Sequence, residues 1–439
     1  MNHFASTIAI VSLAVLLCGC QPQLSVNLQR GSGPEPPDHP SVQRGDSQTL
    51  TWYEDNYFEA QQDARATDRP LVIDFWAYWC HTCLSMKHTV LQDPILGPMA
   101  ERFVWLSINT DRPGNKDVVT RYPPTFWPTF LVVNPHDGSV KGRLQGSTSI
   151  EGFTHWLRVG ETLYRSARGM RPALTPEQPL YHAQQGDVAA AAGDHQEAAR
   201  AYESALNRSE MTWPGRLRVA MGRLVALYAN EAWDSCIQWA GDYLDEAFAR
   251  ASPTAADFAY VGHLCLTRAE QDTVSGQDLR VKSVRLLKKM LEGTELPLTV
   301  DDLSEAMRIQ RTMEAAIGEH QAALNTATAQ RKLLDDAAAS AETAMEAMTY
   351  NWPRAEVYQY LNVPHELVSD LEKSVAALPD AYDPPYRLAW ILLKSRRPED
   401  ALPMAERALS LVYGPRRARV ERLKAEIVDA CGDKGRSSP

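Results

Sequence analysis

The chain of 439 residues has no excess of positive charge, no long apolar run after its first twenty residues and few cysteines. It carries 45 lysines and arginines against 55 aspartates and glutamates, a formal net charge of −10, which argues against a nucleic-acid-binding protein. No stretch after residue 20 approaches the roughly 20 apolar residues that a transmembrane helix needs. Seven cysteines in a chain of this length do not indicate a disulfide framework. The length and the 44% of hydrophobic residues predict a globular protein of two or three domains.

The first twenty residues resemble the signal peptide of a bacterial lipoprotein. An apolar stretch, Ile8–Leu17, ends in Leu17-Cys18-Gly19-Cys20, which resembles a lipobox with Cys20 as the lipid acceptor. Gln21 after the cysteine implies sorting to the outer membrane. Because no Lys or Arg precedes the apolar stretch and Cys18 is unusual at its position, an uncleaved anchor and simple secretion stay open as alternatives. We therefore expect a signal peptide over residues 1–19 and a body in the periplasm, bound to the membrane only through its lipid.

A pair of cysteines, Cys80-His81-Thr82-Cys83, follows an apolar run that predicts a buried strand, Leu71–Trp76. Two cysteines at i and i+3 at the start of a helix can form a disulfide reversibly, and the free N–H groups of the helix end favour a thiolate on the first. Haem attachment would need a histidine where Leu84 stands, and structural zinc would need a second ligand pair. Handling of copper or another soft metal by the two thiolates is a third alternative, without a further ligand at recognisable spacing. The spacing therefore favours thiol–disulfide exchange, with no metal and no cofactor.

Domain boundaries follow changes in composition. Residues 20–48 are rich in Pro, Gly, Ser and Gln and predict a flexible linker, whereas residues 49–166 predict a mixed-sheet α/β domain in the order βαβ and then ββα. A second linker is predicted over residues 167–179, and residues 180–432 are predicted to be helical throughout. The expected elements of the α/β domain are Thr49–Tyr53, Glu54–Thr67, Leu71–Trp76, Cys80–Leu91, Phe103–Asn109, Lys116–Arg121, Phe130–Val133, Ser139–Leu144 and Ser149–Tyr164.

The helical half carries small residues at the spacing of tetratricopeptide helix pairs, which must stack on their neighbours to bury a continuous core. The positions that fit this template are Gly186, Gly193, Ala198, Tyr202 and Ala205, then Leu224, Leu227, Cys236, Ala240 and Tyr243, and near the end Leu367, Leu371, Pro379, Ala389, Ala401, Ala405 and Ala408. Residues 255–350 are helical without a register that we can assign, and a generic helical bundle is the alternative. Cys236, Cys265 and Cys431 lie in apolar helical contexts and are predicted to be small buried core residues.

Three segments of the α/β domain resemble thioredoxins. Residues 75–83 resemble the active-site segment, Trp127-Pro128-Thr129-Phe130 resembles the cis-proline segment, and Asp74 matches the buried aspartate. The resemblance is to the C-terminal domain of the transmembrane thiol:disulfide interchange reductases in particular, and it covers residues 49–164. It implies Cys80 as an exposed nucleophile at the helix start and Cys83 as the resolving thiol. We expect the lysine that usually pairs with this aspartate in the family to be absent, since the aligned position is near Ser107.

The resemblance also implies roles for the residues around the cysteines. Asp74 would accept the proton of Cys83, with a structural ion pair as the alternative. Trp79, Trp127 and Thr129 would contact substrate, because a cis bond before Pro128 brings the backbone of Trp127 beside the cysteines. His81 would tune the redox pair when protonated, or else be a solvated helix residue.

We therefore expect a lipid-anchored periplasmic protein-disulfide oxidoreductase, acting by preference as a reductase. Its partners would be protein thiols or disulfides and a redox partner protein, and its repeat half would recruit one of them. The alternative is an interaction protein whose repeats do the main work and whose thioredoxin-like unit is a docking or chaperone module.

Overall fold

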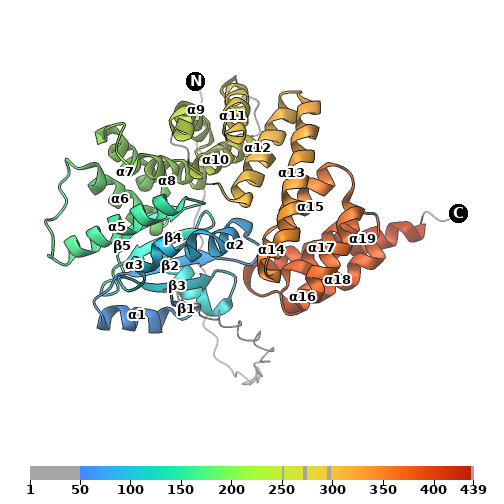
Figure 1. Cartoon of the computed structure of the whole chain (residues 1–439), viewed down its shortest axis with the longest axis horizontal. Coiled ribbons are helices and arrows are strands. Elements are labelled where there is room, and N and C mark those ends of the chain that lie inside the picture. The colour runs from blue at the N-terminus through green and yellow to red at the C-terminus, as the bar shows by residue number, and fades with distance from the viewer. Residues whose placement is uncertain (1–49, 250–251, 270–273, 294–297, 437–439) are drawn as a thin grey trace, which may run out of the picture. The chain divides into compact units, whose positions relative to one another are not determined.

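The computed structural model describes residues 50–249, 252–269, 274–293 and 298–436. All of these belong to one compact unit, which contains a sheet domain followed by a helical region (Figure 1). The predicted signal peptide, the lipid acceptor Cys20 and the first linker lie outside the described residues.

A five-stranded mixed sheet forms the first domain, with the strand order β1-β3-β2-β4-β5. Strands β1, β3 and β2 are parallel, whereas β4 runs antiparallel to both of its neighbours, β2 and β5. Every residue of β2 is buried, because this strand is central and both of its faces are covered. The strands are β1 Trp52–Glu54, β2 Leu71–Trp76, β3 Val104–Asn109, β4 Thr129–Val133 and β5 Val140–Gln145.

Side chains that alternate along the strands feed two apolar cores, one on each face of the sheet. Ile73 and Leu106 belong to one core, with Ala60 of the first helix, and Val72 and Phe130 belong to the other, with the last helix of the domain. The helices are α1 Tyr57–Ala66, α2 His81–His88, α3 Gly97–Ala100, α4 Lys116–Arg121 and α5 Ile150–Ala167, with short 3₁₀ turns at Val90–Gln92, Pro94–Leu96 and Pro113–Asn115.

Three helices of this domain differ from the predicted bounds, and of these α5 ends at Ala167 and not at Tyr164. Helix α1 begins at Tyr57, not at residue 54, because β1 continues to Glu54 and the side chain of Asn56 caps the helix by accepting from the Glu59 amide. Helix α2 ends at His88, not at residue 91, and the chain continues in a 3₁₀ turn. The helix ends because Thr89, its C-cap residue, has φ −119° and ψ −90°, outside the helical range, while its hydroxyl donates to the carbonyl of Ser85.

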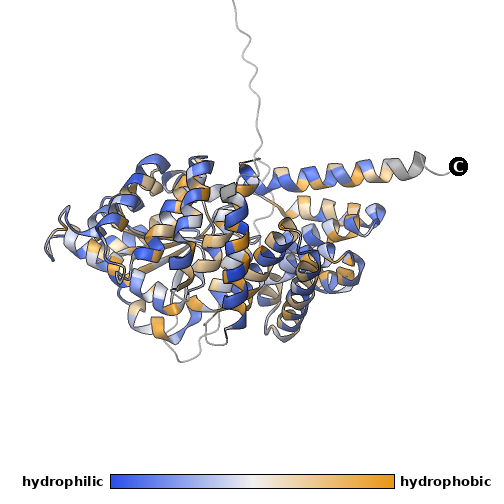
Figure 2. Cartoon of the chain, turned by 90° about the horizontal axis from the view of Figure 1, so that it is seen from above, coloured by the Kyte–Doolittle hydropathy of each residue, from blue (hydrophilic) through white to orange (hydrophobic). Residues whose placement is uncertain are grey.

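The second part of the described chain is helical throughout, as predicted. Its helices are α6 Pro179–Ala191, α7 His195–Arg208, α8 Arg216–Ala229, α9 Trp233–Ala249, α10 Thr254–Arg268, α11 Val274–Glu292, α12 Val300–Ala316, α13 His320–Ser340, α14 Ala344–Thr349, α15 Asn351–Tyr360, α16 Val368–Ala377, α17 Asp383–Lys394, α18 Pro398–Leu411 and α19 Arg417–Arg436, with 3₁₀ turns at Pro364–Leu367 and Gly414–Arg416. Most carry hydrophilic and hydrophobic residues together (Figure 2). No helix in the described part of the chain is both long and apolar enough to cross a membrane.

Small residues let consecutive helices of this region approach closely. A Cβ atom added to Gly186 of α6 would lie 2.5 Å from the ring of Tyr202 in α7. Near the end of the chain, Ala401, Ala405 and Ala408 of α18 are fully buried. Of the template residues, Gly186, Ala401, Ala405 and Ala408 therefore lie where helices pack against one another, whereas Gly193 and Pro379 are exposed.

Cys236 and Cys265 form a disulfide between the neighbouring helices α9 and α10, with Cα atoms 6.1 Å apart. Both are fully buried, but the prediction that they are merely core residues is wrong, because the packing of these two helices brings the sulfurs together. Cys431 is a free, part-exposed cysteine. Twenty-nine residues separate the paired cysteines in sequence, so no local pattern indicated the bond.

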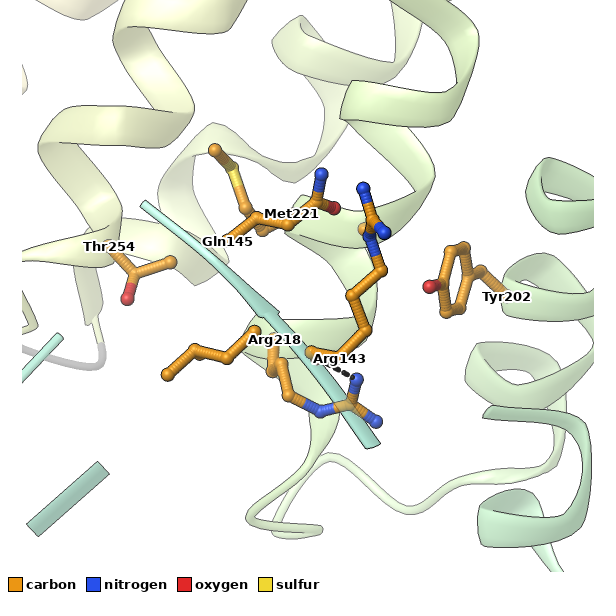
Figure 3. Close-up of a pocket in the computed structure, with 8 residues that line it drawn as sticks. Arg143, Gln145, Tyr202, Arg218, Met221 and Thr254 are labelled. Atoms are coloured by element: carbon orange, nitrogen blue, oxygen red, sulfur yellow. Dashed lines mark hydrogen bonds between the residues drawn. The ribbon is translucent and has the colours of Figure 1, made fainter. Parts of the chain in front are cut away.

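The helical region covers the outer edge of strand β5, which has no strand beside it. The amide of Arg143 donates to Oδ2 of Asp187 at 3.0 Å. Arg218 donates to the carbonyl of Arg143 at 2.8 Å, as Figure 3 shows. Oδ1 of Asp187 accepts a hydrogen bond from the hydroxyl of Tyr202, so both oxygens of this carboxylate have hydrogen-bond donors. These bonds satisfy backbone groups that a bare edge would expose, and they fix the helical region against the sheet.

Candidate active site

The two motif cysteines form a disulfide at the start of helix α2. Their Cα atoms lie 5.2 Å apart, and Cys80 is the N-cap residue of the helix. The amide of Cys83 donates to Sγ of Cys80 at 3.0 Å. The same amide would stabilise a Cys80 thiolate once the bond is reduced, since charge-assisted hydrogen bonds are about twice as strong as neutral ones.

Both cysteines are buried, and the expectation of an exposed nucleophile is wrong in that respect. Cys80 is 5% exposed and Cys83 2% exposed, because the helical region packs over this face of the sheet domain. Cys80 nevertheless lines a cavity of about 400 Å³, whose wall also includes Trp127 of the sheet domain and Trp352 of α15. A substrate would therefore reach the sulfur through this cavity, and the helical region supplies much of its wall.

The bond between Trp127 and Pro128 is cis, as predicted. The ring of Trp127 lies 5.3 Å from that of Trp79 between centroids, and both rings line the cavity beside Cys80. Thr129, by contrast, is fully buried and does not line the cavity, since its hydroxyl donates to the carbonyl of Phe126. The structure thus brings Trp79 and Trp127 to the cysteines and leaves the Thr129 side chain inside the sheet domain.

The predicted loss of a lysine partner for Asp74 is wrong. Asp74 is buried in β2, and Nζ of Lys87 lies 3.2 Å from its Oδ2 and also donates to Oγ of Ser107 at 2.9 Å. Lys87 comes from the motif helix and not from strand β3, where the resemblance places it. A signal was present, because Lys87 follows Cys83 by four residues and so shares its face of the helix.

Burial raises the pKa of Asp74, and the Lys87 ammonium lowers it only in part. A carboxyl with a raised pKa is suited to exchange a proton nearer neutral pH, which the predicted role toward Cys83 requires. That role stays a prediction, and the alternative, a structural ion pair, is present in the structure.

His81, between the cysteines, is not the solvated residue that one interpretation predicted. Its Nδ1 lies 2.6 Å from Oδ1 of Asp301, a buried carboxylate at the start of helix α12. Burial alone would lower the pKa of His81, but Asp301, with Glu305 and Glu356 further away, raises it to about 9. The imidazole is therefore charged at neutral pH. Asp301 lies 220 residues away in sequence, so no local pattern could identify it.

A second acid of the helical region supports the cis-proline segment. Asp257 of α10 accepts a hydrogen bond from the amide of Ser147, and the amide of Gly146 donates to the carbonyl of Pro128 at 2.9 Å. Gly146 has a φ of +78°, and an added Cβ would lie 2.1 Å from the Asp257 carboxylate. Only glycine therefore fits at this junction.

Asp301→Asn should remove the carboxylate that keeps His81 protonated at neutral pH, and with it the contribution of this charged pair to the stability of the fold. The folded pKa of about 9 lies above the unfolded value of 6.5, so this contribution is complete below pH 6.5 and is lost as the pH rises through 9. A shift of this size corresponds to up to about 3 kcal/mol. We expect wild-type stability to fall by that order between pH 6 and pH 9.5, relative to the variant, in chemical denaturation.

The exposed pair Lys332–Asp336 provides the control, since Asp336→Asn should leave this slope unchanged. Equal slopes in the wild type and in Asp301→Asn would contradict the pairing.

Comparison with known proteins agrees with this geometry. Residues 51–135 match the protein-family model described as thioredoxin-like. They form a thioredoxin-like domain. Over 91 residues the chain is 30% identical to the thiol:disulfide interchange protein DsbD of a serogroup A and of a serogroup B strain of Neisseria meningitidis. The match covers 20% of this chain and 15% of each relative, so the chain spans a small part of the length of these relatives.

The predicted fold class is confirmed as an α/β thioredoxin-like domain followed by an all-helical region. The domain and its Cys80–Cys83 pair together indicate a thiol–disulfide oxidoreductase. The match to the family model ends at residue 135, before the helical region.

Proposed function

We propose that this chain is a protein-disulfide oxidoreductase of the periplasm that acts as a reductase, is anchored through lipid on Cys20, and uses its helical region to recruit substrate or a redox partner. The observation that carries the activity is the position of Cys80, which caps helix α2, accepts a hydrogen bond from the Cys83 amide and opens into a cavity beside the cis bond of Pro128.

In the reductive direction, the Cys80 thiolate attacks one sulfur of a substrate disulfide. A mixed disulfide forms, and the other substrate sulfur leaves as a thiolate that takes up a proton. Cys83 then loses its proton, for which Asp74 is the proposed acceptor, and its thiolate attacks Sγ of Cys80. The Cys80–Cys83 disulfide forms, the second substrate thiol is released, and two electrons have passed to the substrate. A dithiol donor must then reduce the protein again.

Different observations support the remaining parts of the proposal. The printed name of the relatives, thiol:disulfide interchange protein, supports exchange chemistry. The reductive direction is supported by the resemblance to interchange reductases. The outer-membrane anchor is supported by the lipobox-like segment ending at Cys20 and by Gln21. Recruitment by tetratricopeptide-like helix pairs is supported by the buried small residues of α6, α7, α17 and α18.

One observation favours a second function. Cys80 is only 5% exposed, which is compatible with a scaffold protein whose thioredoxin-like unit serves for docking and needs no accessible sulfur. Because a substrate reaches Cys80 through the cavity, a short peptide distinguishes the oxidoreductase from the scaffold protein better than a folded protein substrate does.

The test is reduction of two disulfide substrates by the purified chain with dithiothreitol as the electron donor. One substrate is insulin, and the other is a short peptide closed by one disulfide. We expect both reactions to run faster than with dithiothreitol alone, and the peptide to benefit more. If neither reaction is accelerated, the oxidoreductase function is ruled out and the scaffold function is favoured.

A further inference from the structure

The cavity beside Cys80 contains arginines that differ in their partners. Arg308 and Arg387 each pair with a carboxylate, of Glu305 and Asp383 respectively. Arg416 and Arg419 also line the cavity, but within the described ranges neither forms an ion pair with a carboxylate. Arg419 donates from Nε to the hydroxyl of Tyr386 at 3.2 Å, and its other N–H groups and the Arg416 guanidinium are thus available to an anion that enters the cavity.

Arg416 is held in place by the sheet domain. Its guanidinium lies 3.5 Å from the centre of the Trp79 ring, directly beside the redox motif. The segment just before Arg416 is also held against the sheet domain, because the hydroxyl of Tyr413 accepts a hydrogen bond from the side chain of Asn109 at 2.8 Å. Gly414 passes so close to Asp111 that an added Cβ would lie 1.7 Å from its carbonyl oxygen. This charge is therefore positioned before any substrate arrives.

The surroundings of Arg416 leave its charge incompletely balanced. Burial lowers the pKa of Arg416, and the charges of Arg419 and Arg387 lower it further. The carboxylate that acts on it, Asp111, is already bonded by the indole of Trp79 and lies near the hydroxyl of Tyr382. An incoming carboxylate would balance the positive charge of Arg416 and would form charge-assisted, bidentate hydrogen bonds with guanidinium groups.

The size of the cavity limits what can enter. At about 400 Å³ it lies at the lower end of the range for small ligands, and Cys80 is nearly inaccessible outside it. A folded domain does not fit, whereas a segment of extended chain does. The backbone beside the cis bond of Trp127 is the place where such a segment can pair.

We propose that Arg416 and Arg419 make this site selective for extended peptide segments that carry an Asp or Glu next to the reacting cysteine. This inference rests on the proposed function and specifies its substrate class. The part of the wall that α12 and α15 supply is not equivalent, because its acids Glu305 and Glu356 lie near Arg308 and His81. The acidic side chain of the substrate would therefore lie on the side of Trp79.

The experiment uses two short peptides, each closed by one disulfide, that differ only in Asp or Asn beside one cysteine. We expect kcat/KM of the full chain to be about 10- to 100-fold higher for the Asp peptide, the range of one charged hydrogen bond. In Arg416→Gln/Arg419→Gln this ratio should fall to about one. The preference should also weaken as salt is raised.

Arg417→Gln is the matched control, since Arg417 is exposed, pairs with Glu421 and does not line the cavity. It should preserve the ratio. Should the double variant fail to fold, Arg419→Gln alone serves, because Arg419 is exposed, and we expect it to lower the ratio at least about threefold.

Three outcomes separate the inference from the proposed function. Equal rates on the two peptides, unaffected by the arginine variants, would overturn the inference and leave the oxidoreductase function standing. Glutathione disulfide reacting faster than the Asp peptide, with the same dependence on the arginines, would replace the peptide by a small carboxylate-bearing disulfide and overturn the inference. No turnover of any of the three substrates by the wild type would overturn the proposed function itself.

Discussion

Cys80→Ser is expected to reduce thiol–disulfide exchange to the rate seen with dithiothreitol alone. The variant retains Cys83, but Cys83 is 2% exposed and does not line the cavity, so no sulfur remains within reach of a substrate. A serine hydroxyl cannot replace the thiolate, because the thiolate is the attacking species. The measurement is the initial rate of reduction of the disulfide-closed peptide.

Cys83→Ser should behave differently. Cys80 can still attack, but no neighbouring thiol displaces the substrate, so a mixed disulfide accumulates on Cys80. Mass spectrometry of the trapped species, and of proteins captured by this variant in cells, would identify the substrate directly. Cys431→Ser is the control, because Cys431 is the free, part-exposed cysteine of the described chain. Full turnover by Cys80→Ser would rule out the proposed chemistry.

Lys87→Met is expected to lower the free energy of unfolding by about 3–5 kcal/mol at pH 7, because the substitution leaves the Asp74 carboxylate buried without its cation. Lys87 also lies 4.4 Å from the centre of the Trp76 ring, so a further small loss follows from that contact. Denaturant unfolding of the wild type and of the variant measures the difference.

The effect should depend on pH in a direction that the pKa of Asp74 defines. Burial already raises this pKa above 3.8, and loss of Lys87 raises it further. The penalty of the unpaired carboxylate is absent below the unfolded pKa and grows as the pH rises, so the variant should lose less stability at pH 4 than at pH 7. Lys373→Met, at an exposed pair with Asp370, should cost at most about 1 kcal/mol. Asp74→Asn combined with Lys87→Met should recover most of the loss, and an equal loss at both pH values would contradict the ion pair.

The position of the helical region changes how the redox site is understood. In addition to any recruiting role, its residues pair with His81, stack on Trp79 and enclose Cys80. Asp301→Asn and the arginine variants test these contacts without touching the cysteines. The helical region is therefore part of the active site as well as a proposed recruiting surface.

Local patterns were sufficient for the redox pair and its immediate frame. The apolar run Leu71–Trp76 is a buried strand, Cys80 and Cys83 meet at a helix start, and the bond before Pro128 is cis. Each of these features depends on residues within one element or on a short recognisable segment. Helical character after residue 179 likewise follows from composition and spacing, which operate over single turns.

The amino-acid sequence by itself determined the strand, the redox helix, the cis-proline segment and the helical character of the second half. Only the tertiary structure decided that Cys80 is enclosed, that Lys87 and Asp301 pair with Asp74 and His81, that Cys236 bonds to Cys265, and that two arginines line the cavity. The physical reason is the distance along the sequence between the residues that interact. Strand and helix patterns record interactions between near neighbours in sequence, whereas burial, ion pairing and cavity shape depend on residues that only the packing of distant helices brings together.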